Sequence, residues 1–479
     1  MPAPPPSLPP HAGAPDVAAR PALYTLLSVF FFWGFVAASN TILIPLFKAH
    51  FSLQQWQSQL VDSAYYAAYF VGSLVYFFVS LTAGDPLNRF GYKKGLVAGL
   101  GISALGALGM VPAASAGSFG LMLGSLFVIA LGFALQQIVA NPYVIVLGTP
   151  ETASSRSNFA QGVNSLGTTL GPLVLAYALF GNVAGNAAAP LDAVKAPYIA
   201  LAVAFIAFAA LLAFSKLPAV TNDEQLERGL GALKYPQLLL GMVAIFVYVG
   251  TEVSIQSNLP RWYEEAFQVP AEEVGPRIAH FISLYWGSLM IGRWTAGMSF
   301  FNLSKGARRL ATVFVPFVAY GVVLLVNWIK GSPMNDLVAY APFVLILVGA
   351  FFLAQERPAR TMLLFGGLGA LMMLAGLASS GKLALYCLVA GGLFCSVMWP
   401  NIFALSIAGL GRYTSQGAAL LVMMILGGAL IPPLQGAVAD AGGIHVSYLV
   451  PFVGFLYLAA YGVLVARTLR KQGVAFEQA

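Results

Sequence analysis

The sequence predicts an all-α membrane protein made of two similar six-helix halves plus an extra helix pair, about 14 transmembrane helices in total. Only 9% of its 479 residues are charged, 59% are hydrophobic, and the mean hydropathy is +0.81. A soluble globular protein carries about 25% charged residues. A surface with so little charge has to face lipid. Long apolar segments recur along the whole chain, and short stretches of the first half reappear in the second.

The first half is expected to cover residues 21–217. Its apolar segments reach the roughly 20 residues that span a bilayer, and they lie at 23–47, 55–83, 95–114, 118–148, 155–181 and 198–217. Residues 1–20 are rich in Pro and Ala and lack the apolar core of a cleavable signal peptide. We expect them to form a disordered cytoplasmic tail.

The second half is expected to cover residues 236–471, after a charged cytoplasmic linker at 218–235 and before a short tail at 472–479. Its apolar segments lie at 236–259, 275–301, 307–329, 334–355, 359–380, 383–408, 415–439 and 446–467. This half has two helices more than the first, and we assign the extra pair to the region near 307–355. An inserted pair leaves the direction of every later helix unchanged.

The basic residues predict the orientation of the helices. An even number of helices puts both termini on one side, and most of the 24 Lys and Arg residues fall in loops on that side. Positive loops stay in the cytoplasm. We therefore expect a multi-pass, monomeric protein of a bacterial inner membrane with both termini cytoplasmic. Orientation explains the net charge of +7, and no basic stripe with interleaved aromatics suggests nucleic-acid binding.

A repeated motif relates the two halves. "NSLGTTLGP" at 164–172 and "ILGGALIP" at 425–432 share leucine, glycine, leucine and proline at the same spacing, whereas the polar residues do not recur. Small residues at this spacing allow helices to approach closely. Two six-helix halves related by parallel internal symmetry are typical of the major facilitator fold.

Several motifs resemble known families. "GDPLNRFGYKKG" at 84–95 resembles the major facilitator signature G-x-x-x-D-R-x-G-R-[RK], with Asn88 and Tyr92 at two substituted positions. "ANPYVIVLG", "NFAQGVNSLGTTLGP", "MWPNIFALSIAGLG" and "LGGALIPPLQGAVAD" resemble the fucose/glucose–galactose/N-acetylglucosamine sugar permeases over nearly the whole chain. The resemblance implies sugar import by cation symport, with H⁺ or Na⁺ as the coupling ion and no other cofactor.

The chain also departs from this family. Thr41 and Gln137 stand where the fucose branch has acidic residues, so the carboxylates of that branch are missing here. "YVGTEVSIQS" resembles the glucose–galactose and N-acetylglucosamine branches at Glu252. The coupling chemistry is then expected elsewhere than at positions 41 and 137, or is absent.

Amide side chains inside the predicted helices are candidates for binding a small neutral sugar. Amides donate and accept hydrogen bonds without charge, as sugar hydroxyls do. Residues three or four apart share a helix face, and the pairs are Gln161 with Asn164 and Gln137 with Asn141; the further candidates are Asn40, Gln256 and Asn258. The alternative is that these amides only hold helices together.

Aromatic side chains would stack on the apolar faces of a pyranose ring. The candidates are Trp286, Trp399 and Tyr69, followed by Trp33, Tyr65 and Tyr285. The alternative is that they face lipid or belong to the interfacial belts.

Acidic residues within the membrane are candidates for cation coupling. Glu252 lies in the middle of a predicted helix, where a charged carboxylate costs about 3 kcal/mol. Its charge depends on its partner, and protonation or Na⁺ beside it would neutralise the site. Asp62 is the second candidate. The spacing of His, Cys and acidic residues suggests no other metal site.

Gating at the cytoplasmic side is assigned to Arg293 and, in the corresponding loop of the first half, to Asn88, Arg89 and Lys93. The complete prediction is a secondary active importer of a hexose or N-acetylhexosamine that works by alternating access. A sugar uniporter and an exporter of another small molecule are the alternatives. An enzyme is excluded because no His pair, Asp-rich metal motif or long extramembrane segment is present.

Overall fold

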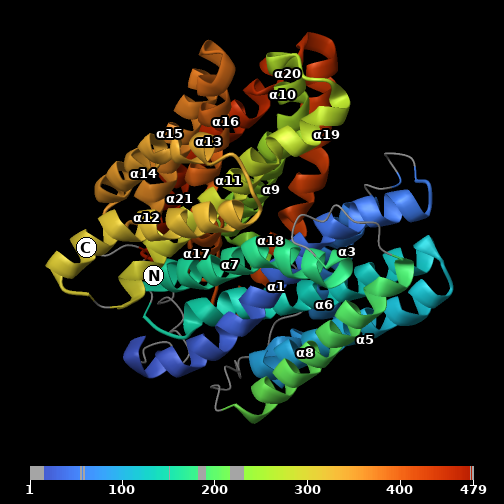
Figure 1. Ribbon diagram of the computed structural model, residues 1–479. Coiled ribbons are helices and arrows are strands. Elements are labelled where there is room, and N and C mark those ends of the chain that lie inside the picture. The colour runs from blue at the N-terminus through green and yellow to red at the C-terminus, as the bar shows by residue number, and fades with distance from the viewer. Residues whose placement is uncertain are drawn as a thin grey trace. The chain divides into compact units, whose positions relative to one another are not determined.

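The computed structural model describes residues 16–53, 57, 60–149, 152–181, 190–215, 231–301, 303–474 and 476. Within these residues every regular element is a helix, as Figure 1 shows. The prediction of an all-α protein is therefore confirmed. Residues 1–15 of the predicted tail and 216–230 around the predicted linker lie outside the described residues.

Thirteen helical stretches of the described residues are long and apolar enough to cross a membrane. A helix is present at each of the fourteen predicted positions, but α11 (Ala271–Gly297) is too polar to count among the thirteen. Its 27 residues include His280, Arg293 and acidic residues in the first turn. The predicted number of about 14 thus corresponds to 13 apolar helices and one polar helix of membrane-spanning length.

The chain divides into two compact units, which are described separately. Unit 1 comprises residues 1–149, 166–235 and 409–423. Its elements are α1 (Asp16–His50), α3 (Leu60–Ala83), α4 (Pro86–Phe90), α5 (Tyr92–Ser115), α6 (Phe119–Val146), the second part of α7 (Ala153–Phe180), η2 (Leu191–Val194), α8 (Lys195–Phe214), η3 (Gly231–Lys234), η5 (Gly411–Tyr413) and α18 (Thr414–Met423). α5 packs on α6 and α8, and α3 packs on α6 and α18 (Figure 1).

Unit 2 comprises residues 150–165, 236–408 and 424–479. Besides α11 and the first part of α7, its elements are α9 (Pro236–Ser257), α10 (Leu259–Phe267), η4 (Met298–Phe301), α12 (Lys305–Ile329), α13 (Met334–Val338), α14 (Ala341–Ala354), α15 (Pro358–Ala378), α16 (Gly381–Cys395), α17 (Met398–Ile407), η6 (Met424–Leu426), α19 (Gly427–Gly442), α20 (Ile444–Ser447) and α21 (Leu449–Lys471). α9 packs on α17, α19 and α21, and α15 packs on α16 and α21.

At two segments, the units differ from the contiguous halves that the sequence suggested. Residues 150–165 group with unit 2, and residues 409–423 group with unit 1. The first part of α7 packs on α11: the Trp294 indole Nε1 donates to the Gly162 carbonyl at 3.0 Å, and a side chain at Gly297 would meet Phe159. The boundaries proposed for the two halves stay a prediction.

The repeated glycine motif makes equivalent contacts in each unit. A side chain at Gly167 of α7 would overlap the Phe31 carbonyl oxygen of α1 in unit 1. A side chain at Gly427 of α19 would overlap the Phe246 carbonyl oxygen of α9 in unit 2. Only glycine allows backbones to approach so closely. The prediction that the motif forms a packing face is therefore consistent with both units.

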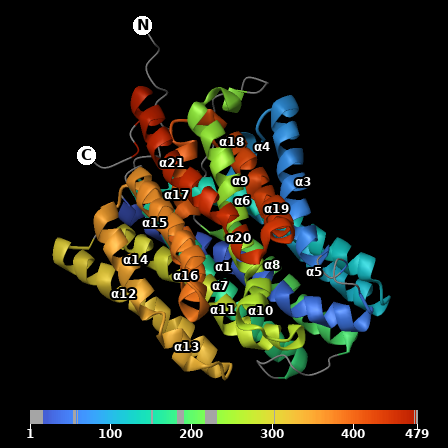
Figure 2. The same ribbon diagram turned by 90° about the horizontal axis from the view of Figure 1, so that it is seen from above.

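The proposed extra pair corresponds to α12 and α14, which contact each other and lie at the edge of unit 2 (Figure 2). α12 also packs on α11, and α14 on α15. Each exposes large apolar side chains, among them Phe314 and Trp328 on α12 and Leu345 on α14. These exposed faces suit a lipid environment.

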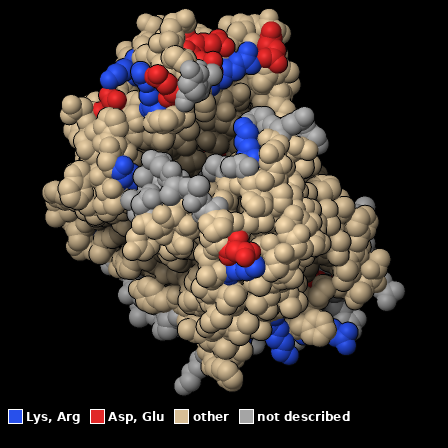
Figure 3. Space-filling view, turned by 45° about the vertical axis from the view of Figure 1, so that its right-hand side comes forward, with Lys and Arg blue, Asp and Glu red and all other residues tan. Residues whose placement is uncertain are grey.

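Most of the surface in Figure 3 is uncharged. Lys, Arg, Asp and Glu side chains gather in a few groups and leave wide areas free of charge. One ion pair of the described residues joins Lys382 to Asp336, with 2.6 Å between Nζ and Oδ1. This distribution agrees with a chain in which only the ends of the helices meet water.

Candidate functional site

Arg293 of α11 connects four helical segments in the core of unit 2. Its Nε donates to the Ser396 carbonyl oxygen at 3.0 Å, and its Nη1 donates to Ser165 Oγ of α7 at 2.9 Å. Nη2 lies 3.8 Å from Glu252 Oε1 of α9. Both charged side chains are buried. An acid and a base buried together offset part of each other's desolvation cost.

Tyr248 forms a bridge between the two charged groups. Its hydroxyl accepts a hydrogen bond from Arg293 Nη2 at 3.4 Å and is also hydrogen bonded to the Glu252 carboxylate. Tyr248 and Glu252 are four residues apart on α9 and therefore share a helix face. Tyr285 of α11 fixes the same turn, since its hydroxyl donates to the Glu252 main-chain oxygen at 2.6 Å.

A proline explains why the Ser396 carbonyl is free to accept from Arg293. In a continuous helix this oxygen would accept from the N–H four residues later. That residue is Pro400, which has no N–H. The chain breaks between α16 and α17 at Ser396 and Val397, and the guanidinium takes the place of the missing donor.

The amides predicted on α7 lie beside this cluster. Gln161 is buried and Asn164 half-buried, and both belong to the part of α7 that groups with unit 2. Ser165, which binds Arg293, also donates to the Gln161 carbonyl oxygen at 3.1 Å. The two amides, the acid Glu252 and the base Arg293 thus occur in one unit.

Other predicted residues of unit 2 divide into two groups. Asn258 at the end of α9 donates to Gln435 Oε1 of α19 at 3.1 Å, which is a contact between helices. Trp399 lies near Tyr248, with 6.4 Å between ring centroids, and its buried Nε1 has no hydrogen-bond partner among the described residues. Gln256 and Trp286 are half-buried. Of these four, Trp399 is the one next to the Arg293 cluster.

In unit 1 the structure brings Tyr69 and Gln137 together. Their side chains are hydrogen bonded, and the Asn141 amide nitrogen donates to the Gln137 carbonyl oxygen at 3.0 Å. The neighbouring Gln136 has a different environment. It accepts from Trp33 Nε1 at 3.0 Å and donates to Ser103 Oγ at 3.1 Å, so it links three helices.

The remaining predicted residues lie apart from these clusters or outside the described side chains. The side chains of Asn40, Asp62 and Asn88 are among those that the structure does not describe. Arg89 is exposed over the Phe90 ring, and Lys93 donates to the Ser215 carbonyl oxygen at 2.7 Å. Arg293 lies at Glu252, and its assignment to gating stays a prediction.

The sequence analysis missed Tyr248 and Ser396. Tyr248 could have been found, because it precedes Glu252 by one helical turn. A pairing of Arg293 with Glu252 was also open to inference, since both are charged residues within membrane helices and such residues pair with each other. Ser396 carries no comparable signal. Within the described ranges, no three His, Cys, Asp or Glu side chains gather as metal ligands would.

These features define a class of protein: a polytopic all-α membrane protein with a buried acid–base pair and polar side chains in its helical core, as membrane carriers have. A sequence model described as the Major Facilitator Superfamily matches residues 25–355. The chain belongs to the major facilitator superfamily and is a multi-pass membrane transporter.

Individual relatives agree with this assignment. The chain is 36% identical over 453 residues to a glucose/galactose transporter of Brucella abortus biovar 1, covering 93% of this chain and 94% of the relative. It is 26% identical over 472 residues to the L-fucose-proton symporter of Escherichia coli K12, covering 92% of each. A crystal structure of a major facilitator transporter, FucP, in the outward conformation matches with a TM-score of 0.71 and 24% identity, covering 92% of this chain and 98% of that one. The structural match concerns the fold.

Proposed function

We propose that this transporter imports a small neutral sugar, a hexose or N-acetylhexosamine, together with H⁺. The observation that carries the proposal is the buried Glu252–Arg293 pair, which lies in the same unit as Gln161 and Asn164. The names of the relatives support a sugar as substrate, and two are named as proton symporters.

Glu252 is proposed as the residue that carries the coupling proton. When ionised it is attracted to Arg293 at 3.8 Å and accepts from the Tyr248 hydroxyl. Protonation removes the charge and hence the attraction, and Arg293 is then held by Ser165, Ser396 and the Tyr248 hydroxyl. A proton would thereby change how α9 is tied to α7 and α11, which is what coupling requires.

The sugar is proposed to bind amides rather than charged groups. Gln161 and Asn164 in unit 2, and Gln137 and Asn141 in unit 1, can each donate to and accept from hydroxyls. The unpartnered Nε1 of Trp399 is a further donor next to Tyr248. Asn258 is a further candidate, and its amide nitrogen also donates to Gln435 Oε1.

The membrane orientation is proposed from charge. The excess of Lys and Arg in loops on the side of both termini supports an inner-membrane location with cytoplasmic ends. A monomer is the simplest functional form, because each major facilitator chain contains both halves of its transport pathway.

A sugar uniporter is the second candidate. It is favoured by Gln137, an uncharged residue in unit 1 where a carboxylate was expected from the fucose branch, and by the partner that Glu252 already has in Arg293. In a uniporter this ion pair would be purely structural.

Uptake into proteoliposomes tests the proposal. Purified protein is reconstituted, and accumulation of glucose, galactose, fucose and N-acetylglucosamine is measured with a pH gradient, a Na⁺ gradient or neither. Accumulation of at least one sugar under a pH gradient is expected. Accumulation under Na⁺ alone would replace H⁺ by Na⁺, downhill uptake alone would indicate a uniporter, and no uptake of any sugar would refute the proposal.

A further inference from the structure

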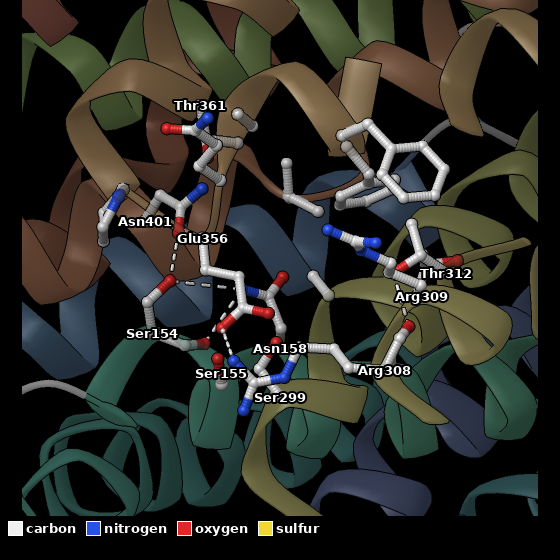
Figure 4. Close-up of a pocket in the computed structure, with 18 residues that line it drawn as sticks. Ser154, Ser155, Asn158, Ser299, Arg308, Arg309, Thr312, Glu356, Thr361 and Asn401 are labelled. Carbon is white, nitrogen blue, oxygen red and sulfur yellow. Dashed lines mark hydrogen bonds and ion pairs between the residues drawn. The ribbon is translucent and has the colours of Figure 1, made fainter. Parts of the chain in front are cut away.

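A polar cavity of about 160 Å³ lies within unit 2, apart from the residues assigned to sugar binding or coupling. Figure 4 shows its lining, which comes from the start of α7, the end of α11 and η4, the start of α12, the end of α14, the start of α15, and α17. The polar residues of this lining are Ser154, Ser155, Asn158, Thr295, Ser299, Arg308, Arg309, Thr312, Gln355, Glu356, Thr361 and Asn401.

The helix ends that line the cavity lie together at one end of unit 2. α7, α12 and α15 begin here, whereas α11 and α14 end here, as alternating directions require. In the proposed orientation this side is cytoplasmic. Two walls of the cavity come from α12 and α14, which are the proposed extra helix pair. A half with only six helices would lack these walls.

The lining of the cavity carries net positive charge. Arg308 Nη1 pairs with Glu356 Oε2 at 3.1 Å, while Arg308 Nε is buried with no hydrogen-bond partner among the described residues. Arg309 is exposed and lines the cavity, and no ion pair of Arg309 occurs within the described part of the chain. Two guanidinium groups against one carboxylate leave a net positive charge. Guanidinium groups and nearby hydroxyls are the groups that bind phosphate oxygens.

Another part offers uncharged acceptors. Asn158 is 2% exposed, and its Oδ1 has no hydrogen-bond partner among the described residues. Its amide nitrogen is already used, because it donates to the Ser154 carbonyl oxygen at 2.9 Å. Ser154 Oγ in turn donates to Asn401 Oδ1. A buried oxygen without a protein donor accepts a hydrogen bond from water or from the hydroxyl or amine of a ligand.

Figure 4 shows Asn401 and Ser154 on one side of the cavity and Arg309 with Thr312 on the other. A ligand that satisfies both sides therefore carries an anionic group with several oxygens and, a few atoms away, hydroxyl groups. We propose that this cavity binds a small soluble phosphomonoester of a polyhydroxylated compound, with the phosphate at Arg309 and a hydroxyl at Asn158.

The binding has a consequence for transport, and this consequence rests on the proposed function. The cavity touches α7, α11 and the α16–α17 region, the segments that Arg293 joins one or two turns away. A ligand bridging α12 to α7 would restrain these helices. Phosphorylation of an imported sugar by a kinase-type reaction yields a phosphomonoester on the cytoplasmic side. This product would bind in the cavity and slow further sugar uptake.

Calorimetric titration of the purified full-length protein tests the binding, with glucose 6-phosphate, inorganic phosphate and glucose as probes. Glucose 6-phosphate is expected to bind, inorganic phosphate to bind more weakly, and glucose not to compete for the site. Arg309→Gln should weaken glucose 6-phosphate binding by about tenfold. Lys305→Gln is the matched control, because Lys305 is exposed on the same helix outside the cavity, and it should leave affinity unchanged.

Asn158→Ala separates the two parts of the ligand. It should weaken glucose 6-phosphate binding while leaving inorganic phosphate binding unchanged, a difference that loss of folding would not produce. No binding of glucose 6-phosphate, or equal binding by Arg309→Gln and wild type, would overturn the proposal. Binding of phosphatidylglycerol from micelles, with no binding of glucose 6-phosphate, would also overturn the proposal, because the cavity would then be a lipid headgroup site. Sugar uptake is measured in parallel, so that a failure of the proposed sugar import can be told apart from a failure of phosphomonoester binding.

Discussion

The Arg293 guanidinium of α11 and the Glu252 carboxylate of α9 lie 3.8 Å apart in the core of unit 2, with the Tyr248 hydroxyl hydrogen bonded to both. The separation is short enough for an ion pair but too long for a direct hydrogen bond. The pair is therefore held through Tyr248 and through the bonds that Arg293 makes to Ser165 and Ser396. Glu252 can therefore lose its charge while the hydrogen bonds of Arg293 to Ser165 and Ser396 stay in place.

Removal of one partner of this pair should destabilise the protein more than removal of both. Arg293→Gln leaves the Glu252 carboxylate buried without its counterion, at a cost of about 3 kcal/mol. The double variant Arg293→Gln/Glu252→Gln leaves no buried charge at this place. We expect its apparent Tm in detergent to lie above that of Arg293→Gln. Equal Tm values for both would mean that the two charges are not coupled.

The adjacent amides Gln136 and Gln137 should respond differently to the same substitution. Gln136→Leu leaves Trp33 Nε1 and Ser103 without their partner, so it should lower stability by about 1–3 kcal/mol and leave the KM for sugar near the wild-type value. Gln137→Leu should raise KM with a smaller loss of stability. Thermal unfolding and transport kinetics of both variants distinguish the roles. The reverse pattern would assign sugar binding to Gln136.

The amides of α7 are expected to act in substrate affinity. Gln161→Ala and Asn164→Ala should each raise the KM for sugar by about tenfold, the usual effect of losing one or two hydrogen bonds. Asn335→Ala is the control, because this amide is exposed on α13. Initial uptake rates over a range of sugar concentrations provide the measurement. Unchanged KM in both α7 variants would show that these amides only connect helices.

The glycine contacts of α19 give a prediction about packing alone. Gly427→Val would place a side chain on the Phe246 carbonyl oxygen of α9 and should cost about 1–3 kcal/mol. Gly436→Val, on the same helix with no atom within 4 Å, should be nearly neutral. Apparent Tm values of the two variants test this. A similar loss in both would remove the argument that close approach requires glycine at 427.

Much of the fold could be predicted because membrane helices reveal themselves by local composition. The segment predicted at 236–259 corresponds to α9 at Pro236–Ser257, and that at 95–114 to α5 at Tyr92–Ser115. Breaks inside apolar runs were missed, as between α16 and α17. A hydropathy window averages over such a break, and the proline that causes it is itself tolerated in membrane helices.

The site was predictable only where the signal lies within one helix. Glu252 and Gln161 stand out as polar residues in apolar surroundings, and the Gln137–Asn141 spacing is visible in the sequence. The partner of each depends on packing between distant segments. Ser165 and Ser396 are separated from Arg293 by more than 100 residues in each case, as the distances along the chain of 128 and 103 show. The cavity at Arg309 depends on seven helical segments and had no signal of its own.

The central claim is that Glu252 carries the coupling proton, and the variant Glu252→Gln tests it most directly. The amide keeps the shape of the side chain and cannot ionise, so proteoliposomes with a pH gradient should no longer accumulate the sugar, while exchange of labelled for unlabelled sugar continues. A variant that still accumulates sugar to the wild-type level under the same gradient would contradict the account, because the proton would then travel without Glu252.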